Sequence, residues 1–164
     1  MRLLVVRHGD AEERAPGGDD SSRALTKKGE QEMKVASAGL RTLVEAIAVI
    51  GASPLVRAQQ TAKIVAKAYG DLRVETVEAL SPGGAPSALV AWAAQYDSAE
   101  TVAVVGHQPD LGTLVTWLMT KAGNSRVELK KGGAALLEFS TRLAAGSGTL
   151  LWLLTGSQLR RIGK

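Results

Sequence analysis

Six short apolar runs, separated by longer segments with helical spacing, constrain the fold of this chain most strongly. The runs lie near 2–6, 47–52, 74–78, 101–105, 134–139 and 149–154. Strands that alternate with helices require crossover connections, which place helices on both faces of a mostly parallel sheet. We therefore predict a three-layer α/β/α sandwich with a central sheet of about six strands. Because 164 residues with 45% hydrophobic content are ample for one core, we expect a single domain over 1–164.

Three helices follow from capping residues and from the spacing of apolar side chains. The first runs over 27–44 after Thr26, a residue suited to the N-cap position. The second covers 55–69. The third has apolar residues at i, i+3, i+4, i+7 and i+8 over 111–119, and we expect it to close at Gly123.

Composition narrows the class of protein. The chain has no cysteine, which excludes disulfides and thiolate chemistry and fits a reducing compartment. The first apolar run is too short for a secretory signal, and no stretch of about 18 apolar residues occurs. We therefore expect a cytoplasmic protein that does not enter membranes. The net charge of +4 favours an anionic ligand, but 4% aromatic residues are too few for a single-stranded nucleic-acid platform.

The only two histidines of the chain each follow a strand-like run. His8 lies in a Val-Arg-His-Gly sequence directly after the first run, and His107 lies in Gly-His-Gln-Pro after the run near 101–105. Ligand sites of open α/β sheets lie at the carboxyl ends of the strands. The two histidines therefore indicate one common site.

The residues around these histidines suit phosphoryl transfer, which needs a nucleophile and fixed positive charge around the phosphoryl oxygens. A neutral imidazole such as His8 is a competent nucleophile, and Arg7 stands beside it. Arg57 falls in the first turn of a predicted helix, where a cation is unfavourable unless an anion binds there. His107 precedes a helix that begins near Pro109, where backbone N–H groups and an imidazolium could stabilise a developing oxyanion.

Each of these residues also has a simpler interpretation when taken alone. The tripeptide from Arg7 to Gly9 fits a solvated loop with a glycine turn. Arg57 fits an exposed side chain, and His107 fits a structural histidine bonded to a loop carbonyl. The functional interpretation therefore depends on the residues occurring together.

Four segments of the chain carry a family resemblance, namely 3–11, 23–29, 53–61 and 104–107. In order and spacing they resemble the histidine phosphatase superfamily, the phosphoglycerate-mutase-like fold known for its Arg-His-Gly motif. The short length, the Arg-His-Gly-Asp-Ala opening and the terminal Trp-Leu-Leu-Thr run are similar to its compact SixA-type branch, which is associated with phosphohistidine phosphatase activity.

The resemblance implies that His8 is the phosphorylated nucleophile and that Arg7, Arg57 and His107 line the phosphate pocket. The chain has no long insertion that could close over a bound product, so we expect hydrolysis rather than a mutase reaction. The leading prediction is a metal-independent phosphatase acting on phosphohistidine in proteins. The alternatives are a phosphatase of a small phosphorylated metabolite or nucleotide, and a non-catalytic phosphate-binding adaptor.

A general acid is harder to assign. Glu78 lies near the position of the carboxylate that larger family members use, and Asp10 is the other nearby carboxylate, although both also fit solvated loops. An imidazole leaving group needs less protonation than a sugar alkoxide, so phosphohistidine hydrolysis tolerates a missing acid. Ser53 and Thr26 could contact substrate, yet roles as turn and cap residues suffice for them.

We expect no cofactor and no metal site. Two histidines, no cysteine and no carboxylate cluster at ligand spacing are a poor set of metal ligands. The expected partner is a phosphorylated protein or small molecule, and neither nucleic acid nor membrane. The basic stretch over 126–131 and the basic tail fit a solvated surface better than a docking site for an acidic protein.

Overall fold

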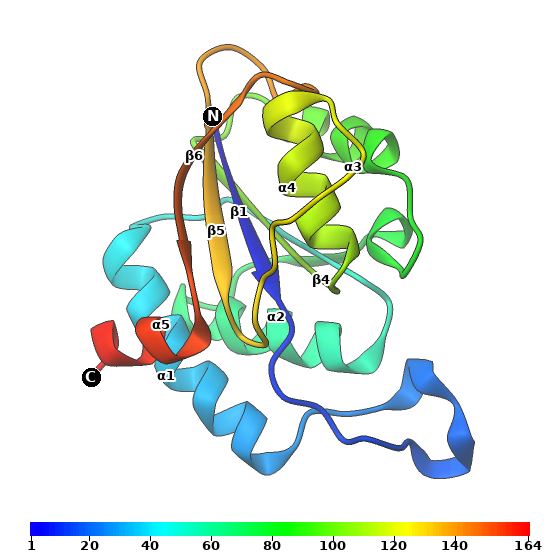
Figure 1. Ribbon diagram of the computed structural model, residues 1–164. Coiled ribbons are helices and arrows are strands. Elements are labelled where there is room, and N and C mark those ends of the chain that lie inside the picture. The colour runs from blue at the N-terminus through cyan, green and yellow to red at the C-terminus, as the bar shows by residue number, and fades with distance from the viewer.

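A six-stranded sheet forms the centre of the molecule (Figure 1). The computed structural model describes residues 1–164, except for the side chain of Pro16. The strand order is β3-β2-β4-β1-β5-β6. The strands are β1 (Arg2–Arg7), β2 (Ile50–Ala52), β3 (Val74–Thr76), β4 (Thr101–Gly106), β5 (Ala134–Phe139) and β6 (Gly148–Leu154). The four strands from β3 to β1 are parallel, and β5 and β6 add an antiparallel edge. The prediction of a mostly parallel sheet is confirmed.

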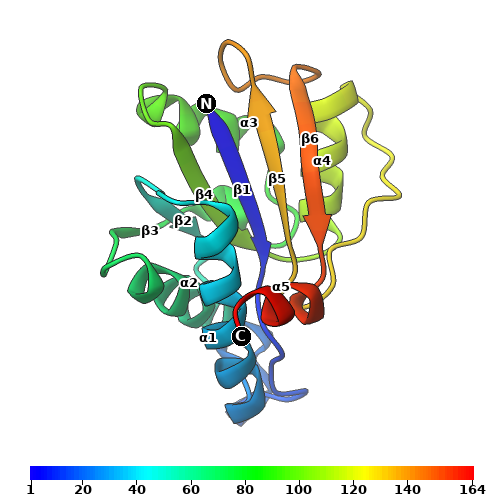
Figure 2. The same ribbon diagram turned by 90° about the vertical axis from the view of Figure 1, so that its left-hand side faces the viewer.

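Helices cover both faces of this sheet. They are α1 (Lys27–Leu43), α2 (Val56–Ala68), α3 (Pro86–Ala93), α4 (Asp110–Thr120) and α5 (Gly156–Ile162). Figure 2 shows α1, α2 and α5 in front of the sheet and α4 behind it. The β1 run is buried on both sides because Leu4 and Val6 pack in the core under α1, α2 and α5, whereas Leu3 and Val5 pack in the core under α3 and α4.

The helices differ from the predictions at three places. Helix α4 ends at Thr120, because Lys121 adopts a left-handed conformation with φ of 67°, so the expected closure at Gly123 is wrong. Helices α3 and α5 were not predicted. Thr26 caps α1 as expected, since its side-chain oxygen accepts a hydrogen bond from the Gly29 N–H at 2.8 Å.

The strand register brings three loops together at one edge of the sheet. Arg7 at the end of β1 pairs with Gly106 at the end of β4, and Ala52 at the end of β2 pairs with Val105. The next residues along the chain leave the sheet at this edge. They are His8, Ser53 and His107.

Candidate active site

His8 lies at the centre of the candidate site and is 6% exposed. Its Nδ1 lies 2.7 Å from the Gly9 carbonyl oxygen, and its Nε2 lies 3.3 Å from Arg57 Nε. A guanidinium N–H can only donate and a carbonyl can only accept, so Nδ1 carries the proton and Nε2 presents a lone pair. Burial, with the positive charges of Arg57 and Arg7, lowers the pKa of His8 to about 4. The ring is therefore neutral near pH 7.

Arg57 occupies the first turn of α2 and is 4% exposed. The prediction that it lies at a helix N-terminus is confirmed. Its Nη1 donates to the backbone carbonyl of Asp20 at 2.9 Å, and its Nη2 pairs with Asp20 Oδ2 at 3.1 Å. One guanidinium thus contacts both His8 and a carboxylate from the loop after β1.

His107 faces His8 across the site, with 5.1 Å between the ring centroids. Its Nε2 lies 2.8 Å from Ser53 Oγ, while its Nδ1 is buried and has no hydrogen-bond partner in the protein. Burial and the nearby His8 and Arg57 lower the pKa of His107 to about 3. This ring is also neutral near pH 7, so the expectation of an imidazolium at this position is wrong, and its Nδ1 has no partner.

Arg7 is anchored by the segment that precedes β5. Its Nη1 donates to the Leu129 carbonyl at 2.8 Å, and its Nε is buried without a partner. Among the described residues, only Arg7 Nε, His107 Nδ1 and Ser37 Oγ are buried side-chain polar atoms without a partner. Two of these three atoms belong to the candidate site, where an oxyanion ligand would satisfy them.

The two predicted carboxylates do not join this cluster. Glu78 begins a short 3₁₀ turn, is exposed, and accepts a long hydrogen bond from Ser81 Oγ at 3.5 Å. Asp10 pairs with Lys131 Nζ at 2.8 Å and accepts from the Thr26 hydroxyl at 3.2 Å. The assignment of Glu78 as a proton donor therefore stays a prediction without a supporting contact.

Three residues contribute contacts that sequence reasoning missed or underrated. Asp20 reaches Arg57 from the polar loop after His8, a loop that its place in the sequence puts beside the site, although no signal marked Asp20 itself. Thr61 accepts from the Gly9 N–H at 3.1 Å and donates to the Arg57 carbonyl at 2.8 Å; its position four residues after Arg57 was the available signal. Ser53, interpreted as a turn residue, is fully buried against His107.

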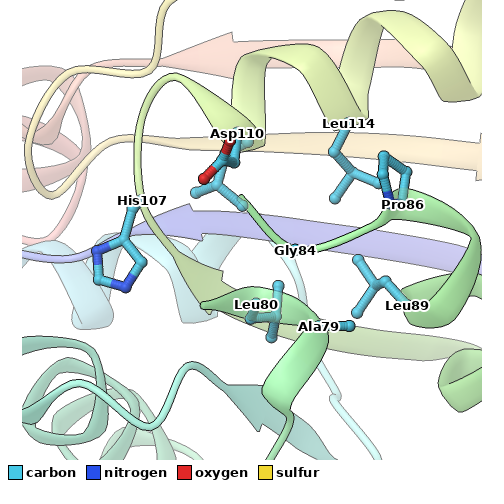
Figure 3. A pocket seen from close by; sticks show the side chains of 9 residues that line it. Ala79, Leu80, Gly84, Pro86, Leu89, His107, Asp110 and Leu114 are labelled. Carbon is cyan, nitrogen blue, oxygen red and sulfur yellow. The ribbon is translucent and has the colours of Figure 1, made fainter. Parts of the chain in front are cut away.

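A small pocket beside His107 is lined mostly by apolar side chains. Figure 3 shows His107 and Asp110 at one end, with Leu80, Leu89 and Leu114 farther along. The carboxylate of Asp110 accepts a hydrogen bond from the Gly83 N–H at 2.9 Å. No arginine or lysine is among the described residues that line this pocket, whereas the positive charges of Arg57 and Arg7 lie near enough to His107 to lower its pKa.

Two further observations concern the described part of the chain. No helix there combines the length and the apolar character that crossing a membrane requires. No group of three or more histidine, aspartate or glutamate side chains lies close enough together to hold a metal ion.

Comparison with known proteins identifies the family. The model of the histidine phosphatase superfamily (branch 1) matches residues 3–81, which include His8 and Arg57. A SixA protein histidine phosphatase, solved with tungstate, superposes with a TM-score of 0.84 and 27% identity over 97% of this chain and 99% of its own. The chain belongs to the histidine phosphatase superfamily. It is a phosphatase by class.

Other matches cover nearly all of this histidine phosphatase. An uncharacterised protein of Picosynechococcus sp. is 35% identical over 158 residues, or 94% of this chain and 96% of the relative. An α-ribazole phosphatase from Shigella flexneri has a TM-score of 0.75 at 17% identity, over 95% of this chain and 97% of its own. At that identity the likeness shows the fold alone.

Proposed function

We propose that this histidine phosphatase hydrolyses phosphohistidine in proteins and that His8 carries the phosphoryl group during turnover. The observation that carries the proposal is a neutral, buried imidazole clustered with two arginines and an imidazole nitrogen that has no partner. His8 supplies a lone pair at Nε2, and Arg57, Arg7 and His107 supply hydrogen-bond donors for phosphoryl oxygens. The resemblance to a SixA solved with tungstate adds support, because tungstate and phosphate are both tetrahedral oxyanions.

In the first step, His8 Nε2 attacks phosphorus, and the bond from phosphorus to the imidazole nitrogen of the substrate breaks. The Gly9 carbonyl holds the proton on His8 Nδ1, so the attacking ring is the neutral tautomer with its lone pair at Nε2. The leaving imidazole receives a proton from solvent at its other ring nitrogen and departs neutral. This step needs no acidic side chain.

In the second step, water attacks the phosphorus of phospho-His8, and the electron pair of the breaking bond returns to Nε2. Water loses its proton to solvent, and inorganic phosphate leaves. Because Nδ1–H stays bonded to the Gly9 carbonyl, His8 also departs as neutral imidazole rather than as an anion. Positive charge from Arg57 and Arg7 stabilises the phosphoryl oxygens in both steps.

The carboxylates near the site favour phosphohistidine over phosphate esters. An alkoxide leaving group needs a proton donor, whereas the imidazole of phosphohistidine takes its proton from solvent. Asp10 pairs with Lys131, and the Glu78 carboxylate accepts a hydrogen bond from Ser81 instead of contacting the cluster. Asp20 lies closest to the cluster. Partial burial acts to raise the pKa of its carboxyl, but the hydrogen bonds from Arg23 and Arg57 outweigh this effect, so the pKa is lowered. Asp20 is thus ionised near pH 7 and is a poor proton donor.

The decisive experiment compares a phosphohistidine-bearing protein with an alkyl phosphate monoester, whose leaving group is an alkoxide, as substrates for wild type and His8→Ala. We expect faster turnover of phosphohistidine, and a loss of at least about 10³-fold in the variant, because the nucleophile is gone. Labelled phosphate should be trapped on the wild-type protein in an acid-labile, alkali-stable form. Thermal unfolding of the variant provides the control for folding.

The same experiment separates the rival functions. Ester hydrolysis without phosphohistidine turnover would keep His8 as nucleophile and assign the site to a small phosphorylated metabolite or nucleotide. Tight binding of phosphate with no trapped intermediate and no turnover on any substrate would favour the adaptor.

A further inference from the structure

The hydroxyl of Ser53 connects the backbone after β2 to the imidazole of His107. Ser53 is 0% exposed, and its backbone N–H donates to the Val105 carbonyl at 3.0 Å, which fixes the residue against β4. Its Oγ accepts from the Leu55 N–H at 3.3 Å and lies 2.8 Å from His107 Nε2. The serine therefore has a fixed position and one proton left to donate.

Hydrogen-bond accounting decides which nitrogen of His107 carries the proton. If Nε2–H donated to Ser53, the serine proton would have no acceptor among the described residues, and the Nδ1 lone pair would also be buried without a donor. If Ser53 donates to Nε2, the serine proton and the Nε2 lone pair are both satisfied. Only the Nδ1–H is then left without a partner, and a buried donor beside two arginines is suited to an anion.

We propose that Ser53 is a positioning residue that holds His107 in the tautomer with its proton on Nδ1, so that His107 donates to a phosphoryl oxygen. The inference rests on the proposed function for the identity of the anion. It also accounts for a contrast between two neutral rings 5.1 Å apart. The carbonyl of Gly9 leaves His8 with a lone pair facing the substrate, whereas the hydroxyl of Ser53 leaves His107 with a proton.

Nitrogen-15 NMR of the histidine rings tests this directly, because the chain has only two histidines and His8→Ala leaves one ring to assign. In wild type near pH 7, we expect His107 Nδ1 to be protonated and Nε2 to be bare. In Ser53→Ala, a population protonated at Nε2 should appear. Ser53→Thr keeps the hydroxyl and should restore the wild-type tautomer.

Activity provides the second readout. Loss of one oriented donor to an oxyanion costs up to about 10²- to 10³-fold, and a partial tautomer change should lower kcat by roughly 10- to 100-fold with a smaller change in KM. Ser37→Ala is the matched control, because Ser37 is an equally buried serine in α1 whose Oγ has no partner. It should leave both the His107 tautomer and kcat unchanged.

Two results would overturn the inference. One is a wild-type spectrum with His107 protonated at Nε2, which needs no variant to fold. The other is an unchanged tautomer in folded Ser53→Ala. Since the NMR readout requires no turnover, a failure of the proposed phosphatase reaction and a failure of the Ser53 assignment are separate outcomes.

Discussion

At the scale of single residues, Arg57 has two neighbours that matter for anion binding. Its Nε contacts the lone pair of His8, and its two terminal nitrogens contact the carbonyl and carboxylate of Asp20. The carboxylate thus occupies donors that the proposed mechanism assigns to phosphoryl oxygens. Because the Asp20 side chain is 63% exposed, its ion pair with Arg57 is weak enough for a substrate to displace.

Removal of the Asp20 charge should therefore strengthen anion binding. In Asp20→Asn we expect the inhibition constants for inorganic phosphate and vanadate to fall by up to about five-fold, which corresponds to about 1 kcal/mol for an ion pair that is exposed on its Asp20 side. Competitive inhibition assays measure this change. Asp19→Asn is the control, since Asp19 is exposed in the same loop and contacts Ser21 instead of Arg57. Weaker inhibition in Asp20→Asn would show that the carboxylate helps to orient Arg57.

At the scale of secondary-structure elements, α2 holds the loop after β1 close to Arg57, which lies in the first turn of the same helix. Thr61 accepts a hydrogen bond from the Gly9 N–H and donates to the Arg57 carbonyl, so one helical turn holds both parts of the site. Helix α5 has a supporting role, because it packs closely on α1. At Gly39 the two helices approach so closely that a Cβ atom would lie 2.1 Å from the Leu159 carbonyl oxygen.

The elements that could be predicted are those with a strong apolar pattern. The central residues of β1 and β4 are buried on both faces, so their sequences are unbroken runs of apolar residues, and α4 has a regular apolar stripe. Helix α3 lacks a polar face and has only eight residues, so neither its length nor the spacing of its apolar residues indicated a helix in the sequence. Helix α5 has seven residues, and its one local signal was the capping box of Thr155 and Gln158.

The site shows the same division. Four site residues lie at or next to a strand end or a helix start, namely Arg7, His8, Arg57 and His107. Their positions relative to the predicted elements were therefore enough to predict that they share one site. The roles of Ser53 and Asp20 depend on contacts with residues 54 and 37 positions away, which only the folded chain creates. Local propensity also explained Ser53 as a turn residue, and this concealed its contact with His107.

The close contact at Gly39 gives a test at the element scale. Gly39→Ala should lower the free energy of unfolding by about 1–2 kcal/mol, because the strain of overpacking exceeds the gain in helix propensity of about 1 kcal/mol. Urea denaturation measures the change. Gln31→Ala, at an exposed position of the same helix, should have little effect. A stabilised Gly39→Ala protein would show that α5 moves aside without cost.

At the scale of the whole molecule, the burial of two neutral histidines links folding to pH. Both pKa values lie below the ordinary 6.5, at about 4 for His8 and about 3 for His107. Between pH 6.5 and these values the unfolded chain binds protons that the folded chain excludes. The free energy of unfolding must therefore fall as the pH is lowered through this window, and the histidines add no pH dependence above it.

Each histidine that stays neutral should contribute a slope of up to about 1.4 kcal/mol per pH unit below its unfolded pKa. The range from pH 6.5 to 5 isolates this effect, since most carboxylates titrate lower. We expect His8→Ala and His107→Ala each to show about half the wild-type slope in urea denaturation, and the double variant to be nearly flat. Lost packing shifts each curve by an amount independent of pH, so the slope reports protonation alone. Equal slopes in wild type and the double variant would mean that both rings accept protons in the folded protein. His8 would then be protonated at mildly acidic pH, and activity would decline there because a protonated imidazole cannot attack phosphorus.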